Sequence, residues 1–167
     1  SYNVAIGYNA GFATTTGIRN TIIGSQAGDA LTTGSYNVAI GFDALTTEDA
    51  HGRNIAIGYR SLKVQNAGAD AYNVAVGYDS GLSITTGTLN TIVGGLAGDA
   101  LTTGAQNTAI GHEALSTEDT GARNTAIGEG SLKTLNFDGN GYNVAVGYNS
   151  GHLISTGVNN TIIGSLA

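Results

Sequence analysis

Short apolar runs recur along the chain at a nearly constant interval. The first, Val4-Ala5-Ile6, is preceded by Asn3 and followed by Gly7, and this five-residue unit occurs ten times. Every copy has Asn first, Ile or Val fourth and Gly fifth. The copies follow one another at a spacing of 17, except that the fourth and eighth steps have a spacing of 19, which gives a longer period of 70. Self-similarity at a fixed period indicates a solenoid, in which each repeat stacks on the next.

The unit itself predicts a short strand. Side chains alternate along a strand, so the second and fourth positions share one face and the third position points to the other. All three positions are mostly apolar, which is typical of a strand covered on both sides. We expect each coil to hold two short strands and two turns, so that the second strand supplies one cover and a neighbouring chain the other. Coils paired in parallel about 4.8 Å apart would build a rod about 45 Å long.

The predicted fold class is therefore all-β, a parallel β-solenoid or β-roll of about ten coils of 17–19 residues. Residues 1–167 form one repeat domain, with 70-residue super-repeats 1–70 and 71–140 and a partial one at 141–167. Neither end shows an atypical capping repeat, so we expect a segment of a longer fibre. The two longer coils should bulge at residues 66–71 and 136–141, and loops are where solenoids tend to carry recognition.

The aliphatic residues at the fourth position are assigned to the core or to a chain–chain interface. They are Ile6, Ile23, Ile40, Ile57, Val76, Val93, Ile110, Ile127, Val146 and Ile163.

The asparagines that open the units form a column in the stack, and we interpret them as a structural ladder. Either each side chain bonds the one below, or each holds its own backbone in a turn. These residues are Asn3, Asn20, Asn37, Asn54, Asn73, Asn90, Asn107, Asn124, Asn143 and Asn160.

The eight tyrosines fall in two further columns on either side of the apolar strand. One lies just before the Asn, and the other, just after the Gly, holds Tyr8, Tyr59, Tyr78 and Tyr148. These four are candidate interface or ligand-binding aromatics. An aromatic strip can bind sugars or a host surface, but packing between chains is favoured, because amphipathic aromatic residues are enriched at interfaces.

Composition narrows the function classes. Charged residues make up 11% of the chain, and the net charge is −6. The six basic residues form no run, so nucleic acid is not an expected partner. The sequence has no Cys and no apolar run near the roughly 18 residues of a membrane span, so neither disulfides nor membrane insertion is expected in this segment.

No enzyme motif emerges, and we expect no catalytic residue, no metal and no cofactor. The acidic pairs Glu48-Asp49 and Glu118-Asp119 are adjacent residues, which would point to opposite faces of a strand rather than toward one substrate. A solvated edge is the expected place for them, and the histidines form no cluster. Thr pairs such as Thr15-Thr16 suggest an ice-binding array, but their position next to Gly favours a turn.

The units Asn37–Gly41 and Asn107–Gly111 resemble the head repeat of trimeric autotransporter adhesins and the Ala-Ile-Gly repeats of phage tail fibres. The resemblance covers the whole chain as a repeat. It implies a β-roll assembled as a homotrimer of parallel chains, located outside the cell, on a cell surface or on a virion. It implies attachment to a host glycan or receptor rather than catalysis.

The sequence thus favours a structural and adhesive fibre segment. Two alternatives remain: an ice-binding β-solenoid, which needs a flat outward Thr lattice, and a carbohydrate-binding or carbohydrate-active phage spike, which needs opposed carboxylates in a groove.

Overall fold

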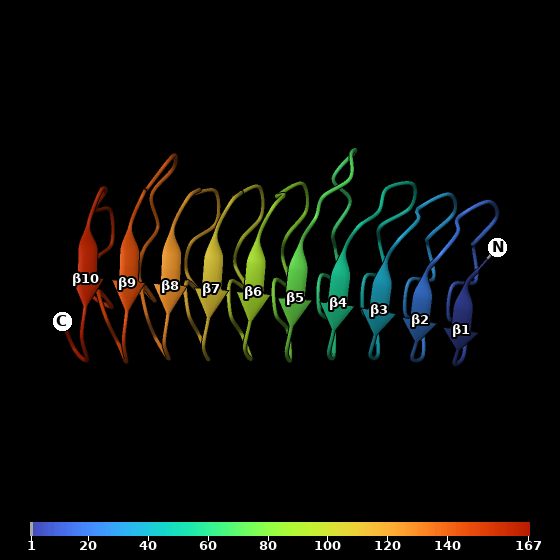
Figure 1. The fold of residues 1–167 in the computed structure, drawn as a ribbon, viewed down its shortest axis with the longest axis horizontal. Coiled ribbons are helices and arrows are strands. Elements are labelled where there is room, and N and C mark those ends of the chain that lie inside the picture. Colours follow the sequence, from blue (N-terminus) through green and yellow to red (C-terminus); the bar gives the residue numbers. More distant parts are fainter. Residues whose placement is uncertain (1) are drawn as a thin grey trace.

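A computed structural model describes residues 2–167, and it confirms the predicted parallel β-solenoid (Figure 1). The described chain is all-β and contains no helix. Ten strands of three residues lie side by side in one parallel sheet, in chain order. They are β1 (Val4–Ile6), β2 (Thr21–Ile23), β3 (Val38–Ile40), β4 (Ile55–Ile57), β5 (Val74–Val76), β6 (Thr91–Val93), β7 (Thr108–Ile110), β8 (Thr125–Ile127), β9 (Val144–Val146) and β10 (Thr161–Ile163).

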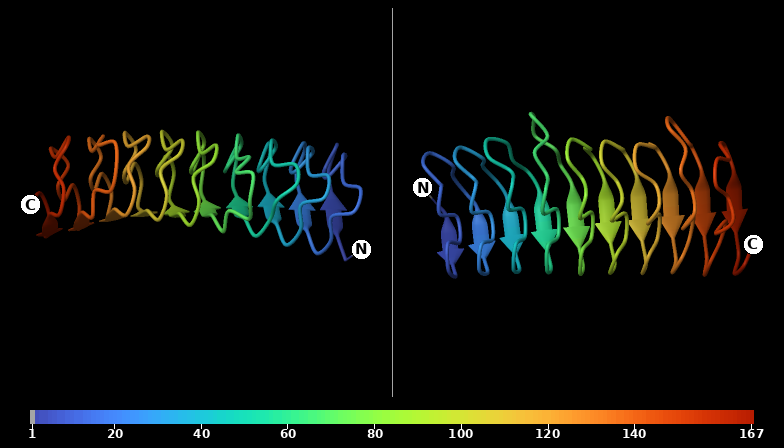
Figure 2. Two further views of the ribbon diagram at one scale, coloured as in Figure 1. Left: turned by 90° about the horizontal axis from the view of Figure 1, so that it is seen from above. Right: turned by 180° about the vertical axis from the view of Figure 1, so that it is seen from behind.

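The strands pair position on position along the whole stack. Val38 lies opposite Ile55, and Ile55 lies opposite Val74, although the second pair is two positions further apart along the chain than the first. The extra residues are therefore accommodated outside the sheet. They form two loops that rise above the other coils, one between β4 and β5 and one between β8 and β9, as predicted (Figures 1 and 2).

The second strand expected in each coil does not form. The segment that returns from one strand to the next consists of turns and bends, and it lies along the side of the stack opposite the strands (Figure 2, left). Its backbone is not extended, because residues such as Asp43 and Leu45 adopt φ angles of 53° and 52°. Coil-to-coil hydrogen bonds persist there nonetheless, for example from Leu45 N–H to the Ser61 carbonyl at 3.0 Å.

The core lies between the sheet and these return segments. The third position of each strand points inward, so that Ala39, Ala75 and Ile92 are fully buried. Facing them are leucines and an isoleucine of the return segments, such as Leu45 and Leu101. The long stack therefore has a narrow core, filled by a small residue from the sheet and a large one from the return segment in most coils.

This arrangement corrects one part of the sequence assignment. The fourth-position residues Ile6 to Ile163 are not core residues, because their side chains point away from the return segments. Most are half-buried, and Ile6, Ile110 and Ile163 are 59%, 37% and 72% exposed. The other assignment of these residues is to a chain–chain interface. They lie on a face of the sheet that no other part of the described chain covers.

Among residues 2–167, no helix is long and apolar enough to span a membrane.

Candidate functional site

The outer face of the sheet is a regular surface that runs along all ten strands. We call outer sheet face the side chains at the second and fourth positions of β1 to β10. The second position holds Val, Ile or Thr and the fourth holds Ile or Val, so the surface contains no charged residue. Neighbouring side chains are about 4.8 Å apart between strands and about 6.6 Å apart along a strand. Contiguous apolar surface of this kind marks a site of interaction.

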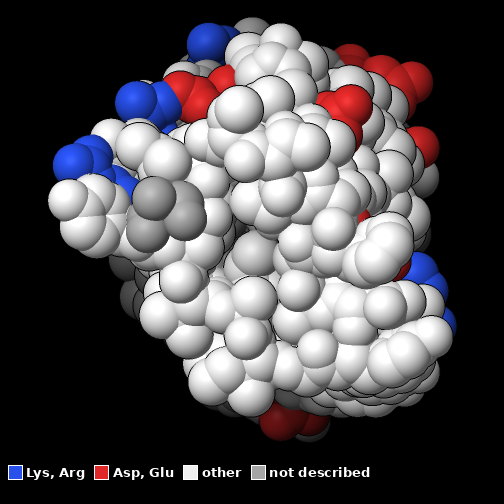
Figure 3. All heavy atoms as spheres, turned by 90° about the vertical axis from the view of Figure 1, so that its right-hand side faces the viewer, with Lys and Arg blue, Asp and Glu red and all other residues white. Residues whose placement is uncertain are grey.

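Charge is absent from this surface and begins at its two margins. Seen from the β1 end, most of the molecule is uncharged and the basic atoms lie at the margins of the profile (Figure 3). Because the outer sheet face has neither charge nor a covering segment, association through it would bury apolar side chains without desolvating an ion.

One margin of the outer sheet face is formed by the residue that precedes each ladder Asn. We call this column the Tyr–Arg edge. Its members in order are Tyr2, Arg19, Tyr36, Arg53, Tyr72, Leu89, Gln106, Arg123, Tyr142 and Asn159.

Arginine and tyrosine side chains interleave along that edge. The Arg19 guanidinium carbon lies 5.9 Å from the centre of the Tyr2 ring and 5.3 Å from that of Tyr36. Arg53 lies 5.5 Å from the rings of both Tyr36 and Tyr72. These are cation–π contacts, so the aromatic faces are occupied by guanidinium groups. The Tyr36 hydroxyl also accepts a hydrogen bond from Arg19.

The opposite margin is formed by the residue that follows each unit's Gly. Phe42, Tyr59 and Tyr78 stack there, with ring centres 5.6 Å and 5.2 Å apart and planes within 13° of parallel. Of the candidate aromatics, Tyr59 and Tyr78 thus belong to one stack. Tyr8 and Tyr148, which are 73% and 50% exposed, stand apart from it.

The asparagine column combines the two roles considered for it. Each Asn side-chain oxygen accepts the backbone N–H of the Asn one coil further on, at 2.8–3.3 Å in all nine steps. Most of the amide groups also donate to a backbone carbonyl of the following turn, as Asn107 does to Gly121 at 2.8 Å. The ladder therefore ties side chain to backbone between coils and also fixes the turn, which is a structural role.

Two members of the ladder depart from this pattern. The side-chain nitrogens of Asn54 and Asn124 are buried without a hydrogen-bond partner. Both begin the longer coils, where two extra residues move the carbonyl that would accept the bond. The longer coils thus carry unpaired buried amide nitrogens, those of Asn54 and Gln65 in the first and that of Asn124 in the second.

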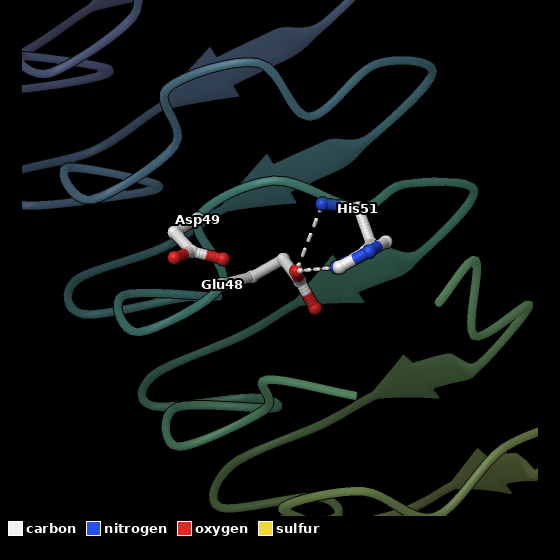
Figure 4. A group of neighbouring side chains, drawn as sticks. All are labelled: Glu48, Asp49 and His51. Carbon is white, nitrogen blue, oxygen red and sulfur yellow. Dashed lines mark hydrogen bonds and ion pairs between the residues drawn. The ribbon is translucent and has the colours of Figure 1, made fainter. Parts of the chain in front are cut away.

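Only part of each acidic pair lies on a solvated edge as expected: Asp49 is exposed and Asp119 is half-buried, whereas Glu48 and Glu118 are fully buried. Glu118 accepts the N–H of Gly121 at 2.8 Å and that of Phe137 at 3.2 Å. Glu48 accepts the N–H of His51 at 3.1 Å (Figure 4). Each of these carboxylates holds a turn of its own coil, and Glu118 also anchors the bulged loop of the next coil. The sequence did not predict either role.

The fold brings Glu48, Asp49 and His51 close together, which the sequence did not predict. One donor atom from each residue lies within 4.8 Å of the others, which is compatible with a cation (Figure 4). However, Glu48 uses its Oε1 for the turn, and Gly121 replaces the histidine in the second super-repeat while Glu118 keeps the same bond. The role that both copies share is to hold the turn.

Burial perturbs these carboxyl groups. Desolvation raises the pKa of Glu48 and of Glu118, and backbone N–H bonds to the ionised form only partly offset it. Desolvation also raises the pKa of Asp29 and of Asp99. At a pH between the ordinary carboxyl pKa and these raised pKa values, the folded chain therefore binds more protons than the unfolded chain does.

Because the folded chain binds more protons in this pH range, its stability depends on pH. The free energy of unfolding should be highest below the ordinary Glu value of 4.5 and should fall as the pH rises through the raised pKa values of the folded state. Thermal unfolding followed by circular dichroism at a series of pH values measures it. The double variant Glu48→Gln/Glu118→Gln should show a flatter profile, with the remaining slope due to Asp29 and Asp99. Equal slopes in the two proteins would contradict this account.

The fold and this surface define a β-solenoid repeat protein. Comparison of the chain with family models, with curated proteins and with solved structures gives no match.

Proposed function

We propose that this chain is a structural and adhesive segment of a surface or virion fibre, and that it associates with copies of itself through the outer sheet face. The observation that carries the proposal is the uncovered, uncharged face that runs through all ten strands. A face repeated in every coil suits an equally long partner, and a second copy of the same chain has the same length and spacing.

Symmetry favours a closed assembly, and the number three comes from the resemblance described above. Most homo-oligomers are closed, and three rods that set their strips around one axis form such an assembly. Parallel chains place each coil beside the same coil of its neighbours, so coils of equal width meet along the whole length. The homotrimer of parallel chains is therefore the assembly that we favour.

Adhesion would be carried by the parts that remain outside such an assembly. The two bulged loops, 66–71 and 136–141, stand out from one edge (Figure 1). Three parallel chains would present each loop three times, and several weak contacts made together bind far more tightly than one. The partner would be a glycan or a receptor on a host surface, and the fibre would lie outside the cell that makes it.

The solution mass tests the assembly. Light scattering behind a sizing column should give three times the 16.7 kDa of the chain. Burial of the apolar strip should keep the mass constant on moderate dilution. A mass of one chain at all concentrations would contradict the self-association and with it the fibre proposal.

A second candidate is ice binding, and one observation favours it. The outer sheet face carries Thr at the second position of five strands, three of which (β6 to β8) are adjacent: Thr21, Thr91, Thr108, Thr125 and Thr161. This is a different set from the Thr pairs beside Gly, which lie in bends. A monomeric protein that lowers the freezing point without lowering the melting point would support this candidate over the fibre.

The carbohydrate-active alternative gains no support from the described residues. Glu48 and Glu118, which would have to face each other across a sugar, are each buried inside a turn of separate coils.

A further inference from the structure

The Tyr–Arg edge is built at a backbone cost that other residues would avoid. From Arg19 onward every member of the column has a positive φ, with values between 51° and 63°. Gly or Asn adopts this conformation most readily, whereas a large side chain pays a penalty of about 1 kcal/mol or more. Only Asn159 is such a residue. The other positions hold Tyr, Arg, Leu or Gln. Thirteen described non-Gly residues outside this column share the conformation, so the cost belongs to the turns in general, and the contacts of the side chains set this edge apart.

Two of the three arginines at this edge differ from the other basic residues of the molecule. Four of the six basic residues are paired with carboxylates: Arg53 with Asp70, Arg60 with Asp79, Lys63 with Asp43 and Lys133 with Glu113.

Arg19 and Arg123, by contrast, have no carboxylate partner among residues 2–167. Both are exposed and both lie on the Tyr–Arg edge. In a chain with twelve acidic residues and a net charge of −6, two cations without an acidic neighbour are a local departure from the general charge.

The polar groups of the edge face outward as hydrogen-bond donors. Arg19 donates from Nη1 to the Tyr36 hydroxyl, and Arg123 donates from Nη1 to the Tyr142 hydroxyl at 3.0 Å. A phenol that accepts one bond still has its own proton to donate, and a guanidinium has five N–H groups in a planar fork. The rings hold the guanidinium groups in place, which lowers the entropy that a bound anion would have to overcome.

We propose that the Tyr–Arg edge binds an acidic polysaccharide, with the carboxylate or sulfate groups on Arg19 and Arg123 and the sugar hydroxyls on the tyrosine hydroxyls between them. Arg19 and Arg123 lie six coils apart, about 29 Å by strand spacing, so only an extended polymer touches both. The inference deepens the adhesive role proposed above, because it names the chemistry of the attached surface, and it rests on that role.

A polysaccharide fits the edge better than a nucleic acid does. A single-stranded nucleic acid is held largely by bases that stack on open aromatic faces. Aromatic faces, on which bases would stack, are covered by guanidinium groups along the first five coils.

The test is binding of the assembled protein to immobilised polygalacturonic acid and dextran sulfate, with neutral dextran and single-stranded oligothymidine as comparisons. The double variant Arg19→Gln/Arg123→Gln should bind both acidic polymers about tenfold more weakly or worse. Its matched control is Arg60→Gln/Lys133→Gln, which also removes two positive charges, but from side chains that are already paired with carboxylates. This control should bind nearly as well as the parent protein does. Both variants should keep the solution mass of the parent, so a failure here is distinct from a failure to assemble.

Several results would overturn the proposal. These are absence of binding to both acidic polymers, equal losses in the two double variants, equal binding to neutral dextran, or equal binding to oligothymidine. Binding to only one acidic polymer would support the proposal and identify the anion as carboxylate or sulfate.

Discussion

Replacing Ala109 by Asp will prevent the solenoid from folding. Ala109 is the inward third position of β7, it is fully buried, and its neighbours in the core are aliphatic. A carboxylate placed there has neither room nor a hydrogen-bond donor, and burying an unpaired charge costs several kcal/mol. Circular dichroism and thermal unfolding measure the loss.

The matched control introduces the same residue one position further on. Ile110 points to the outer sheet face, and so does Ile40 in β3. The double variant Ile40→Asp/Ile110→Asp should keep its secondary structure but give the mass of a single chain, because charges on a buried strip oppose association. A double variant that unfolds as Ala109→Asp does would contradict the assignment of the two faces. A folded double variant with the parent's mass would contradict the interface.

The second large effect is expected at the Gly that ends each unit. Gly94 has a φ of 134°, and a Cβ there would lie 2.4 Å from the carbonyl oxygen of Gly111 in the next coil. Since that atom is backbone, the coils would have to move apart. Gly94→Ala should therefore lower the free energy of unfolding by about 3 kcal/mol or more.

The adjacent glycine provides the control. A Cβ on Gly95 would meet the Cδ2 atom of His112 at 3.6 Å, an ordinary contact, and its φ is not in the left-handed region. Gly95→Ala should change stability little in denaturant unfolding. Similar losses in the two variants would show that close stacking at the Gly column does not limit the fold.

The stacking of coils could be predicted because it depends on the same residues recurring at a fixed spacing along the chain. Each unit needs the same Asn and Gly at the same height, so the pairing of Ile55 with Val74 follows from the motif even though the interval is longer. The bulged loops follow for the same reason, since the extra residues of the longer coils have no place in the sheet.

Which face of the strand is inside could not be predicted, because both faces are apolar. In most coils the volume of the side chains matches the outcome. The space between sheet and return segment is filled from the opposite side by residues such as Leu45, and the small side chain of Ala39 fits inside while the larger Ile40 stays outside. On hydrophobicity alone, Ile40 would be expected inside and Ala39 outside. In β2 and β6 the inward residues are Ile22 and Ile92, so volume alone does not decide the face.

The missing second strand and the buried glutamates share one cause. Both depend on local backbone geometry that the residue pattern does not encode. Leu45 is apolar and looks like a strand residue, yet it lies in a left-handed turn with a φ of 52°. Glu118 looks like a surface acid, yet the turn and the neighbouring loop direct two N–H groups at it.

The hydrogen bonds between coils have a mechanical consequence. They run along the long axis of the stack, because parallel strands bond at right angles to their own direction. A force that pulls the two ends of the stack apart therefore stretches these hydrogen bonds along their length. Every junction between coils bears the same force. The weakest junction sets the yielding force, and each coil that opens releases its own length of chain as slack. Under tension such a chain would lengthen in steps and absorb work before it parted.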